Sequence, residues 1–393
     1  MEQRAICVHA ELCGGCVYQG VEYQEQLQEK DKIVNDLITS KKLNIKKIES
    51  MQASPNLYGY RNKMEYTFGD MEKDGETTLG MHPRGKFMSV LTVDECQLVH
   101  DDFNKILSAT LNFVKEKGYR HYNKKSHKGI VRHLQIRKSM YCNEILVNII
   151  TSSQGEFDEE GWLRSLKMLE LENELVGVVR TINDRIGDSV ACDELKVLYG
   201  RDYYNEKIAG LEFQVSVFSF FQTNVVAAEK LYLDAISLID NLEGKVVFDL
   251  FCGTGTISQI VAKQGAKKVI GVEIVKDAVD MAKVNAKLNN LENCEFICGD
   301  VFDVLEKKQM GDALPDVIVV DPPRAGIQPK ALDKILSYGV KQIVYISCNP
   351  KSLMDNLYYM SYNGYDVMYL KPYDNYAFNR HVEVVVSLVK KDV

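Results

Sequence analysis

Apolar runs of strand length alternate with helix-length stretches throughout the C-terminal part of the chain. After Lys245, stretches such as Lys276–Leu288 and Pro329–Tyr338 separate the first six of seven such runs. This alternation predicts a mainly parallel, doubly wound α/β sheet. The last two runs have no clear helix between them, so we expect the final strand to pair antiparallel. The seven predicted strands are Val246–Leu250, Lys268–Glu273, Glu295–Cys298, Val317–Asp321, Gln342–Ser347, Asp366–Lys371 and Val382–Val389.

The N-terminal part has a different pattern. One amphipathic helix is predicted over Val21–Ser40, with an apolar stripe of Tyr23, Leu27, Val34, Leu37 and Ile38. From about Tyr58 to Val217, short alternating runs predict an antiparallel α+β unit. They include Lys63–Phe68, Leu134–Arg137 and Glu144–Ile150.

Length and composition narrow the class of protein. A chain of 393 residues indicates two or three domains, and 46% hydrophobic with 26% charged residues is typical of a globular protein. No run of eighteen apolar residues is present, so no membrane-spanning helix is expected. The first residues lack the layout of a signal peptide, which predicts a cytoplasmic location. The ten cysteines should then be reduced, and a cysteine group indicates a metal or catalytic site.

Charge is unevenly distributed along the chain. The net charge of −7 argues weakly against a nucleic-acid partner. The stretch Lys117–Lys138, however, holds eight Lys or Arg, three His and no acidic residue. Such a stretch can form a phosphate-facing patch, or it can be an ordinary solvated surface.

A glycine-containing turn follows the first strand of the alternating region. Gly253 and Gly255, within Asp249–Thr256, allow the backbone to approach a nucleotide-type ligand closely. Ser258 stands where a dinucleotide fingerprint has its third glycine, which disfavours NAD, and no phosphate-binding Gly-Lys-Ser/Thr loop is present, which disfavours ATP hydrolysis.

Acidic residues at three strand ends point to a particular cofactor. With Asp249 at the first end, Glu273 can accept hydrogen bonds from a ribose diol, and Asp300 can bind an adenine amine. Three carboxylates suit a nucleoside that carries a positive sulfonium and no phosphate. The arrangement therefore favours S-adenosylmethionine over a plain doubly wound fold with turn glycines.

Two further strand ends carry candidate chemistry. Asp321–Arg324 reads Asp-Pro-Pro-Arg, which is similar to the loop with which amine methyltransferases orient an exocyclic amine, although Arg324 replaces their usual aromatic residue. Ser347–Pro350 contains Cys348, which those enzymes do not need. A thiolate that adds to C6 of uracil makes C5 nucleophilic, and a base must later remove the C5 proton. His381 and Glu383 both offer that base, and we choose Glu383.

Aromatic residues precede the alternating region. The segment Phe218–Asn224 can hold a base that has left its stack, or it can form a hydrophobic hinge between domains. The segment alone does not distinguish these roles.

Cysteines cluster near the N-terminus. Cys7, Cys13 and Cys16 are followed much later by Cys96, so only one close pair is present, whereas structural zinc usually takes two. Three clustered cysteines and a distant one suit a cubane iron–sulfur cluster better. A redox Cys-x-x-Cys motif and a set of unrelated thiols are the alternatives.

Together these motifs resemble the S-adenosylmethionine-dependent RNA uracil-C5 methyltransferases that form 5-methyluridine in tRNA or rRNA, in the branch that carries iron–sulfur clusters. The resemblance spans essentially the whole chain. It rests on Phe220–Asn224, Asp249–Thr256, Asp321–Arg324, Ser347–Pro350, His381–Glu383 and the four N-terminal cysteines.

The resemblance implies a role for each motif. It implies Cys348 as nucleophile, Glu383 as proton-abstracting base, and Phe220 beside the flipped base. The implied ligands of a [4Fe-4S] cluster are Cys7, Cys13, Cys16 and Cys96. The implied contacts to S-adenosylmethionine are Gln222, Phe251, Thr256, Glu273, Asp300 and Asp321. Thr256 stands where some relatives have Asn.

The resemblance also implies the domain organisation. Residues 1–18 and 51–217 would form a central α+β domain with the cluster, and residues 19–50 and 218–393 the class I methyltransferase domain. Only six residues precede Cys7, so we expect the N-terminal RNA-binding β-barrel of many relatives to be absent, which leaves more of the RNA contact to Lys117–Lys138. We expect a monomer that acts on RNA and has no membrane partner. An amine methyltransferase and a non-catalytic iron–sulfur RNA-binding module are the competing interpretations.

Overall fold

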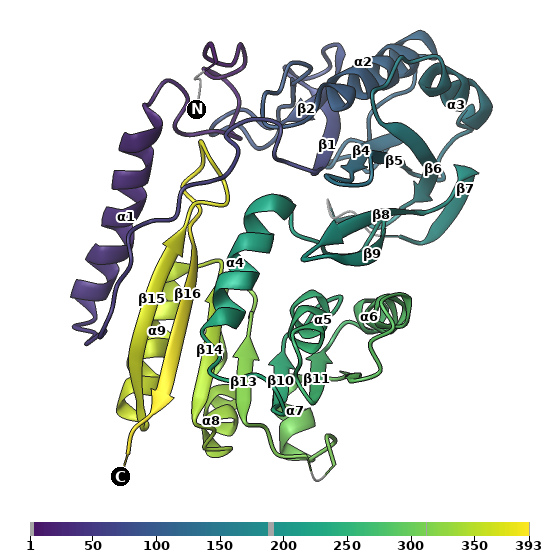
Figure 1. Ribbon diagram of the computed structural model, residues 1–393. Coiled ribbons are helices and arrows are strands. Elements are labelled where there is room, and N and C mark those ends of the chain that lie inside the picture. The colour runs from purple at the N-terminus through teal and green to yellow at the C-terminus, as the bar shows by residue number, and fades with distance from the viewer. Residues whose placement is uncertain (1–3, 188–191, 312, 393) are drawn as a thin grey trace. The chain divides into compact units, whose positions relative to one another are not determined.

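The computed structural model describes residues 4–187, 192–311 and 313–392 (Figure 1). The chain divides into two compact units, and each is made from separate stretches of sequence. Unit 1 comprises Met1–Gly20, Asn56–Lys207 and Val215–Phe218. Unit 2 comprises Val21–Pro55, Ile208–Gln214 and Ser219–Val393.

Unit 2 is built around one mixed β-sheet. Its strands are β10 (Val246–Leu250), β11 (Lys268–Glu273), β12 (Cys294–Cys298), β13 (Val317–Val320), β14 (Gln342–Ser347), β15 (Tyr365–Tyr373) and β16 (Glu383–Lys390). Within the described residues they are ordered β12-β11-β10-β13-β14-β16-β15. Strands from β12 to β14 pair parallel, and β16 pairs antiparallel with β14 and β15. The expected mainly parallel sheet and antiparallel final strand are confirmed.

Helices cover both faces of this sheet (Figure 1). They are α1 (Tyr23–Ser40), α4 (Val225–Ser237), α5 (Thr256–Lys263), α6 (Lys276–Leu288), α7 (Val301–Glu306), α8 (Pro329–Ser337) and α9 (Pro350–Tyr362). Phe248 and Leu250 of β10 point to the face that α1, α7, α8 and α9 cover. Asp249 points to the opposite face, where Ser258 of α5 meets it. Because both faces are covered, the parallel strands are nearly continuous apolar runs.

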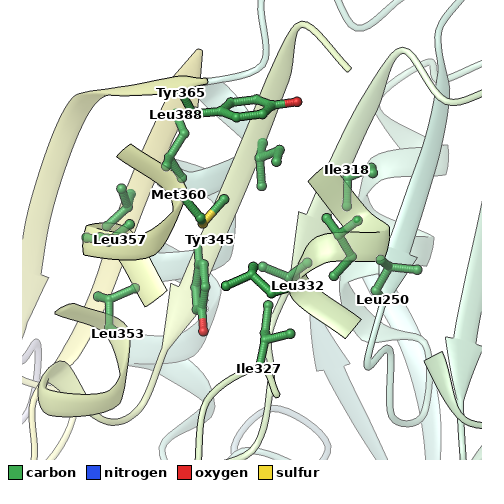
Figure 2. Packing of buried hydrophobic residues seen from close by; sticks show 14 of the residues in the cluster. Leu250, Ile318, Ile327, Leu332, Tyr345, Leu353, Leu357, Met360, Tyr365 and Leu388 are labelled. Atoms are coloured by element: carbon green, nitrogen blue, oxygen red, sulfur yellow. The ribbon is translucent and has the colours of Figure 1, made fainter. Parts of the chain in front are cut away.

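The core of unit 2 lies between the sheet and α8 and α9. Figure 2 shows strand side chains such as Leu250 and Ile318 packed with Leu353, Leu357 and Met360 of α9 in one cluster. Pro350 occupies the first turn of α9, where its missing N–H costs no hydrogen bond. This packing fixes the strand ends from which the candidate site is built.

The N-terminal segment of unit 2 extends the sheet. Helix α1 packs beside α9, and its predicted stripe is buried at Tyr23, Leu27, Val34 and Ile38. After α1, Ile45, Ile48 and Gln52 form isolated parallel bridges with β15. The segment therefore covers the free edge of β15.

Unit 1 is built around a second sheet. Its strands are β1 (Lys63–Asp70), β2 (Thr77–Met81), β3 (Leu91–Thr92), β4 (Val131–Lys138), β5 (Glu144–Thr151), β6 (Glu174–Ile182) and β7 (Glu194–Gly200), in the order β3-β2-β1-β4-β5-β6-β7 among the described residues. Its neighbours pair antiparallel except β5 and β6, which pair parallel. The expected antiparallel α+β unit departs from antiparallel pairing at this pair, because a crossover through α3 (Glu159–Lys167) joins the two strands. Helix α2 (Asp101–Glu116) packs beside α3 over the core.

Part of the basic stretch Lys117–Lys138 lies inside unit 1. Arg132 is buried and donates hydrogen bonds to the carbonyls of Asn183, Arg185 and Gly187, at 2.7, 2.8 and 2.6 Å. Other buried members of the stretch are His133, Arg137 and Lys138. The expectation that Lys117–Lys138 takes more of the RNA contact is therefore wrong for these residues, since strand β4 runs through the core.

A small sheet of β8 (Tyr203–Ile208) and β9 (Leu211–Ser216) contributes residues to both units. No helix in the part of the chain that the structure describes is long and apolar enough to cross a bilayer.

Candidate active site

The carboxyl ends of five parallel strands meet at one edge of the unit 2 sheet. Glu273 is the last residue of β11, and the turns after the other four strands carry the candidate residues Phe251, Asp300, Asp321 and Cys348. Because parallel strands present their carboxyl ends side by side, the fold gathers these residues along one edge. All of them belong to unit 2.

The turn after β10 has a left-handed backbone. Phe251, Gly253 and Gly255 have φ of 68°, 54° and 75°. A Cβ atom at Gly255 would meet the Phe296 ring at 2.6 Å, so this position requires glycine. Gly255 is also the N-cap of α5, and half-buried Thr256 is the first residue of that helix. The turn therefore places helix N–H groups beside the strand ends.

Glu273 links the first two strand ends. Its Oε2 accepts a hydrogen bond from the N–H of Gly253 at 3.1 Å, and its Oε1 accepts one from Val275 at 2.9 Å. A carboxylate has about four acceptor sites, so acceptor capacity remains for a ribose diol. Asp300 is exposed and caps α7 by accepting from the N–H of Asp303 at 3.2 Å. Asp300, which we predict to bind the adenine amine, therefore also caps helix α7.

A buried carboxyl–hydroxyl pair lies beneath the turn. Ser258 Oγ donates to Asp249 Oδ2 at 2.5 Å, and Asp249 Oδ1 accepts no hydrogen bond from the described residues. Burial raises the pKa of Asp249 to about 7, although the Ser258 hydrogen bond opposes the rise. From the sequence, Ser258 stands out only as the residue in place of a third glycine. Its spacing, nine residues after an acidic strand residue, is the signal that could have identified the pair.

The segment before α4 contributes two predicted site residues. Gln222 donates from Nε2 to the Tyr232 hydroxyl at 2.9 Å, and its Oε1 lies 3.5 Å from the hydroxyl of Tyr376. Phe220 is 69% exposed, and its carbonyl accepts from Thr254 Oγ1 at 3.5 Å. An aromatic ring this exposed at the sheet edge is free of core packing and can meet a planar ligand.

Cys348 and two carboxylates form the chemical centre. Burial and then the carboxylates of Glu383 and Asp321 raise the pKa of the half-buried Cys348 thiol to about 11. Burial raises the pKa of Glu383 to about 7, while Arg324 lowers it. Burial and then Glu383 raise the pKa of Asp321 well above its usual range. Ser347 of β14 pairs with Val384 of β16, so Cys348 and Glu383 lie at the same end of these two neighbouring strands.

Arg324 and His381 are further members of this centre. Arg324 Nη2 lies 3.1 Å from His381 Nδ1, and the Arg324 carbonyl accepts from Asn349 Nδ2 at 2.7 Å. The guanidinium lowers the pKa of both Cys348 and Glu383. From the sequence, Arg324 stands out as a replacement for the usual aromatic residue of the Asp-Pro-Pro loop. Its position directly after two prolines at a strand end is the signal that could have placed it in the site.

The four N-terminal cysteines form a separate group in unit 1. Burial and then the thiols of Cys96, Cys13 and Cys7 raise the pKa of Cys16 to about 12. Burial, and to a smaller extent Cys7 and Cys13, also raise the pKa of Cys96. Burial and mutual repulsion thus both disfavour the thiolate form of these cysteines.

The local backbone supports this cysteine group. The N–H of Gly15 donates to the Cys13 sulfur at 3.4 Å, and Arg84 donates to the carbonyls of Cys13 and Cys16. Within residues 4–187, 192–311 and 313–392, no three His, Cys, Asp or Glu side chains form a group that could hold one metal ion. Cysteine thiols, with N–H groups that donate to sulfur, are the donor set by which proteins hold an iron–sulfur cluster.

Comparisons with known proteins identify the family. A family model described as tRNA (uracil-5-)-methyltransferase matches residues 22–391. An uncharacterized RNA methyltransferase of Clostridium tetani is 45% identical over 380 residues, which is 97% of this chain and 82% of the relative. One of Caldanaerobacter subterraneus subsp. tengcongensis is 42% identical over 389 residues, which is 99% of this chain and 85% of the relative.

A solved structure agrees in fold. The Pyrococcus abyssi tRNA (uracil-54, C5)-methyltransferase in complex with S-adenosyl-L-homocysteine is similar, with a TM-score of 0.78 and 23% identity. The alignment covers 96% of this chain and 85% of that one. This likeness shows a methyltransferase-like α/β fold with mixed sheets. The family model and the two relatives establish that the chain belongs to the tRNA (uracil-5-)-methyltransferase family of RNA-methylating enzymes.

Proposed function

We propose that this enzyme transfers a methyl group from S-adenosylmethionine to C5 of a specific uridine in rRNA or tRNA. Cys348 is the nucleophile and Glu383 the base. The observation that carries the proposal is the β14–β16 register, which places the half-buried thiol of Cys348 beside the buried carboxylate of Glu383 at the carboxyl end of β14. Uracil-C5 methylation needs these two groups, whereas exocyclic-amine methylation needs no thiol.

The residues act in a fixed order. The Cys348 thiol gives its proton to water, the sulfur forms a bond to C6, and the electrons of the C5–C6 double bond move toward C5 and O4. S-adenosylmethionine, when bound, supplies the methyl carbon to C5. Glu383 then removes the C5 proton, the C5–C6 double bond re-forms, and the sulfur leaves. A Glu383 pKa of about 7 suits a base that must accept and release a proton near neutral pH.

Residues at different strand ends bind different parts of the cofactor. In this proposal the cofactor-binding residues are Gln222, Phe251, Thr256, Glu273, Asp300 and Asp321. Glu273 binds the ribose with the acceptor sites that its two backbone N–H partners leave. Asp321 favours a positive sulfonium, because a cation would relieve the repulsion that it shares with Glu383.

Unit 1 supplies the iron–sulfur site. Cys7, Cys13, Cys16 and Cys96 would hold a [4Fe-4S] cluster, since a positive cluster stabilises the thiolates that burial and mutual repulsion disfavour. The methyl transfer described needs no electron. The cluster would therefore supply structural or RNA-positioning support rather than redox chemistry.

In this proposal, unit 2 binds the target uracil of the RNA. Phe220 offers a ring on which the flipped uracil stacks. We expect the protein to act as a monomer. The cytoplasmic location stays a prediction.

The test is covalent trapping with RNA that contains 5-fluorouridine, because fluorine at C5 blocks the proton removal that frees the enzyme. With S-adenosylmethionine we expect a denaturation-stable protein–RNA complex, and none with Cys348→Ala. Nucleoside mass analysis should find 5-methyluridine in ordinary RNA. Methyladenosine or methylguanosine without a covalent complex would instead support an amine methyltransferase that uses Asp321-Pro322-Pro323.

A further inference from the structure

The loop that joins β15 to β16 (residues 374–382) meets the candidate site at two points. The hydroxyl of Tyr376 lies 3.5 Å from Gln222 Oε1, and His381 Nδ1 lies 3.1 Å from Arg324 Nη2. The loop ends where β16 begins, at Glu383. Its conformation therefore sets the position of the proposed base.

This loop does not adopt a relaxed backbone throughout. Phe378, a buried aromatic residue, has φ of 63°, in the left-handed region that bulky residues avoid. Such a conformation persists only where the surrounding structure holds it. The N–H of Phe378 donates to Gln26 Oε1 of α1 at 3.0 Å, and Gln26 has no exposed surface.

A buried ion pair joins the same helix to the first residue of the loop. Lys30 Nζ of α1 lies 2.6 Å from Asp374 Oδ1, and both side chains are fully buried. Lys30 also donates to the Tyr376 carbonyl at 3.0 Å. Tyr23, on the same helix, donates to Asp374 Oδ2 at 2.9 Å. Thus α1 contacts the loop through three polar side chains.

Packing alone does not account for these polar residues. Gln26 and Lys30 lie on the apolar face of α1, where the neighbouring buried positions are Leu27 and Val34. Apolar residues of similar volume are often at least as stabilising as a buried ion pair, because the charges must lose their water. A hydrogen-bonded network, in contrast, specifies a single loop conformation.

We propose that Tyr23, Gln26 and Lys30 of α1, with Asp374, are positioning residues. They hold the β15–β16 loop so that Glu383 reaches the C5 proton and Tyr376 supports Gln222. This inference rests on the proposed uracil-C5 methylation. It assigns an active-site role to a helix that lies more than 300 residues from the reaction centre in sequence.

The test separates proton removal from bond formation. In Lys30→Met, we expect the covalent enzyme–RNA intermediate on ordinary RNA to accumulate, as the base is displaced, and turnover to fall about 10-fold to 100-fold at saturating substrates. Adduct formation with 5-fluorouridine RNA should change much less, because it does not need proton removal. Tyr23→Phe, which removes one hydroxyl and keeps the ring, should shift the same ratio by a smaller factor. Lys32→Met, at an exposed position of the same helix, is the matched control.

Each outcome has one meaning. If Lys30→Met and Tyr23→Phe fold, by circular dichroism, and release methylated RNA as fast as the wild type, the positioning role is wrong. If Lys30→Met does not fold, Tyr23→Phe alone decides by the same ratio. If both variants lose trapping and turnover equally, the network is merely structural and the inference fails. If the wild type itself forms no adduct through Cys348, the proposed function fails instead.

Discussion

The two cysteine sites of this protein are alike in burial but different in their neighbours. Cys348 in unit 2 faces the carboxylates of Glu383 and Asp321. Cys16 and Cys96 in unit 1 face other thiols, and both sites have raised pKa values. A thiol beside a base can exchange a proton and attack carbon, whereas mutually repelling thiols become thiolates when a metal cluster shares their charge. The neighbours, more than the cysteines themselves, therefore distinguish a catalytic site from a ligand site.

The sharpest way to break this comparison is to remove the lone thiol. Cys348→Ala should lose methylation of ordinary RNA by at least about 10³-fold, because no other group supplies the sulfur that activates C5. The measurement is transfer of radiolabelled methyl to RNA. Cys142→Ala, at a half-buried cysteine of unit 1 outside the four-thiol group, is the control. Equal rates for the two variants would contradict the account.

Replacing Glu383, the carboxylate beside the Cys348 thiol, should have the next largest effect on turnover. Glu383→Gln should lower turnover by about 10²-fold to 10⁴-fold and leave the enzyme bonded to methylated RNA, since nothing removes the C5 proton. Gel electrophoresis under denaturing conditions would detect the complex. If His381→Asn accumulates the complex and Glu383→Gln does not, the base has been misassigned.

Replacing one of the four N-terminal cysteines should lower the iron content and leave the reaction at Cys348 intact. Anaerobically purified protein should carry about four iron atoms per chain, and Cys13→Ser should lose most of them. Trapping by 5-fluorouridine RNA should persist in Cys13→Ser, within the limit of its lower stability. Cys142→Ser is the matched control for iron content. A colourless, iron-free wild type would contradict the ligand assignment.

The smallest expected effect is a shift with pH. A carboxyl whose pKa is raised to about 7 is protonated below pH 7 and cannot accept the C5 proton. Decay of the covalent intermediate should therefore speed up as pH rises and level off above about pH 7. Arg324 lowers the Glu383 pKa, so Arg324→Gln should move the midpoint upward. Stopped reactions analysed across pH would show this, and a midpoint at the ordinary glutamate value would oppose it.

Local patterns predicted most of unit 2. The sequence gives the bounds of β10, β11, β14 and α6 without error, because continuous apolar runs between turn residues define buried parallel strands. The predicted strand-end residues also lie along one edge. These residues could be predicted because each lies at or just after the end of an apolar run, and parallel strands place such ends at one edge.

Long-range polar contacts explain what could not be predicted. Lys30 and Gln26 occupy buried positions of α1, and their partners in the β15–β16 loop are more than 300 residues away. Arg132 of β4 reads as part of a basic surface, but it binds three backbone carbonyls inside unit 1. A polar side chain is buried only where it has a hydrogen-bond partner, and these partners come near only when the chain is folded.

The most direct test of the central claim is to map the covalent bond. The complex with 5-fluorouridine RNA and S-adenosylmethionine would be digested with protease and nuclease and sequenced by mass spectrometry. The account predicts a methylated fluorouridine attached to the peptide that contains Cys348. Attachment to any other residue, or a complex that carries no methyl group, would contradict it.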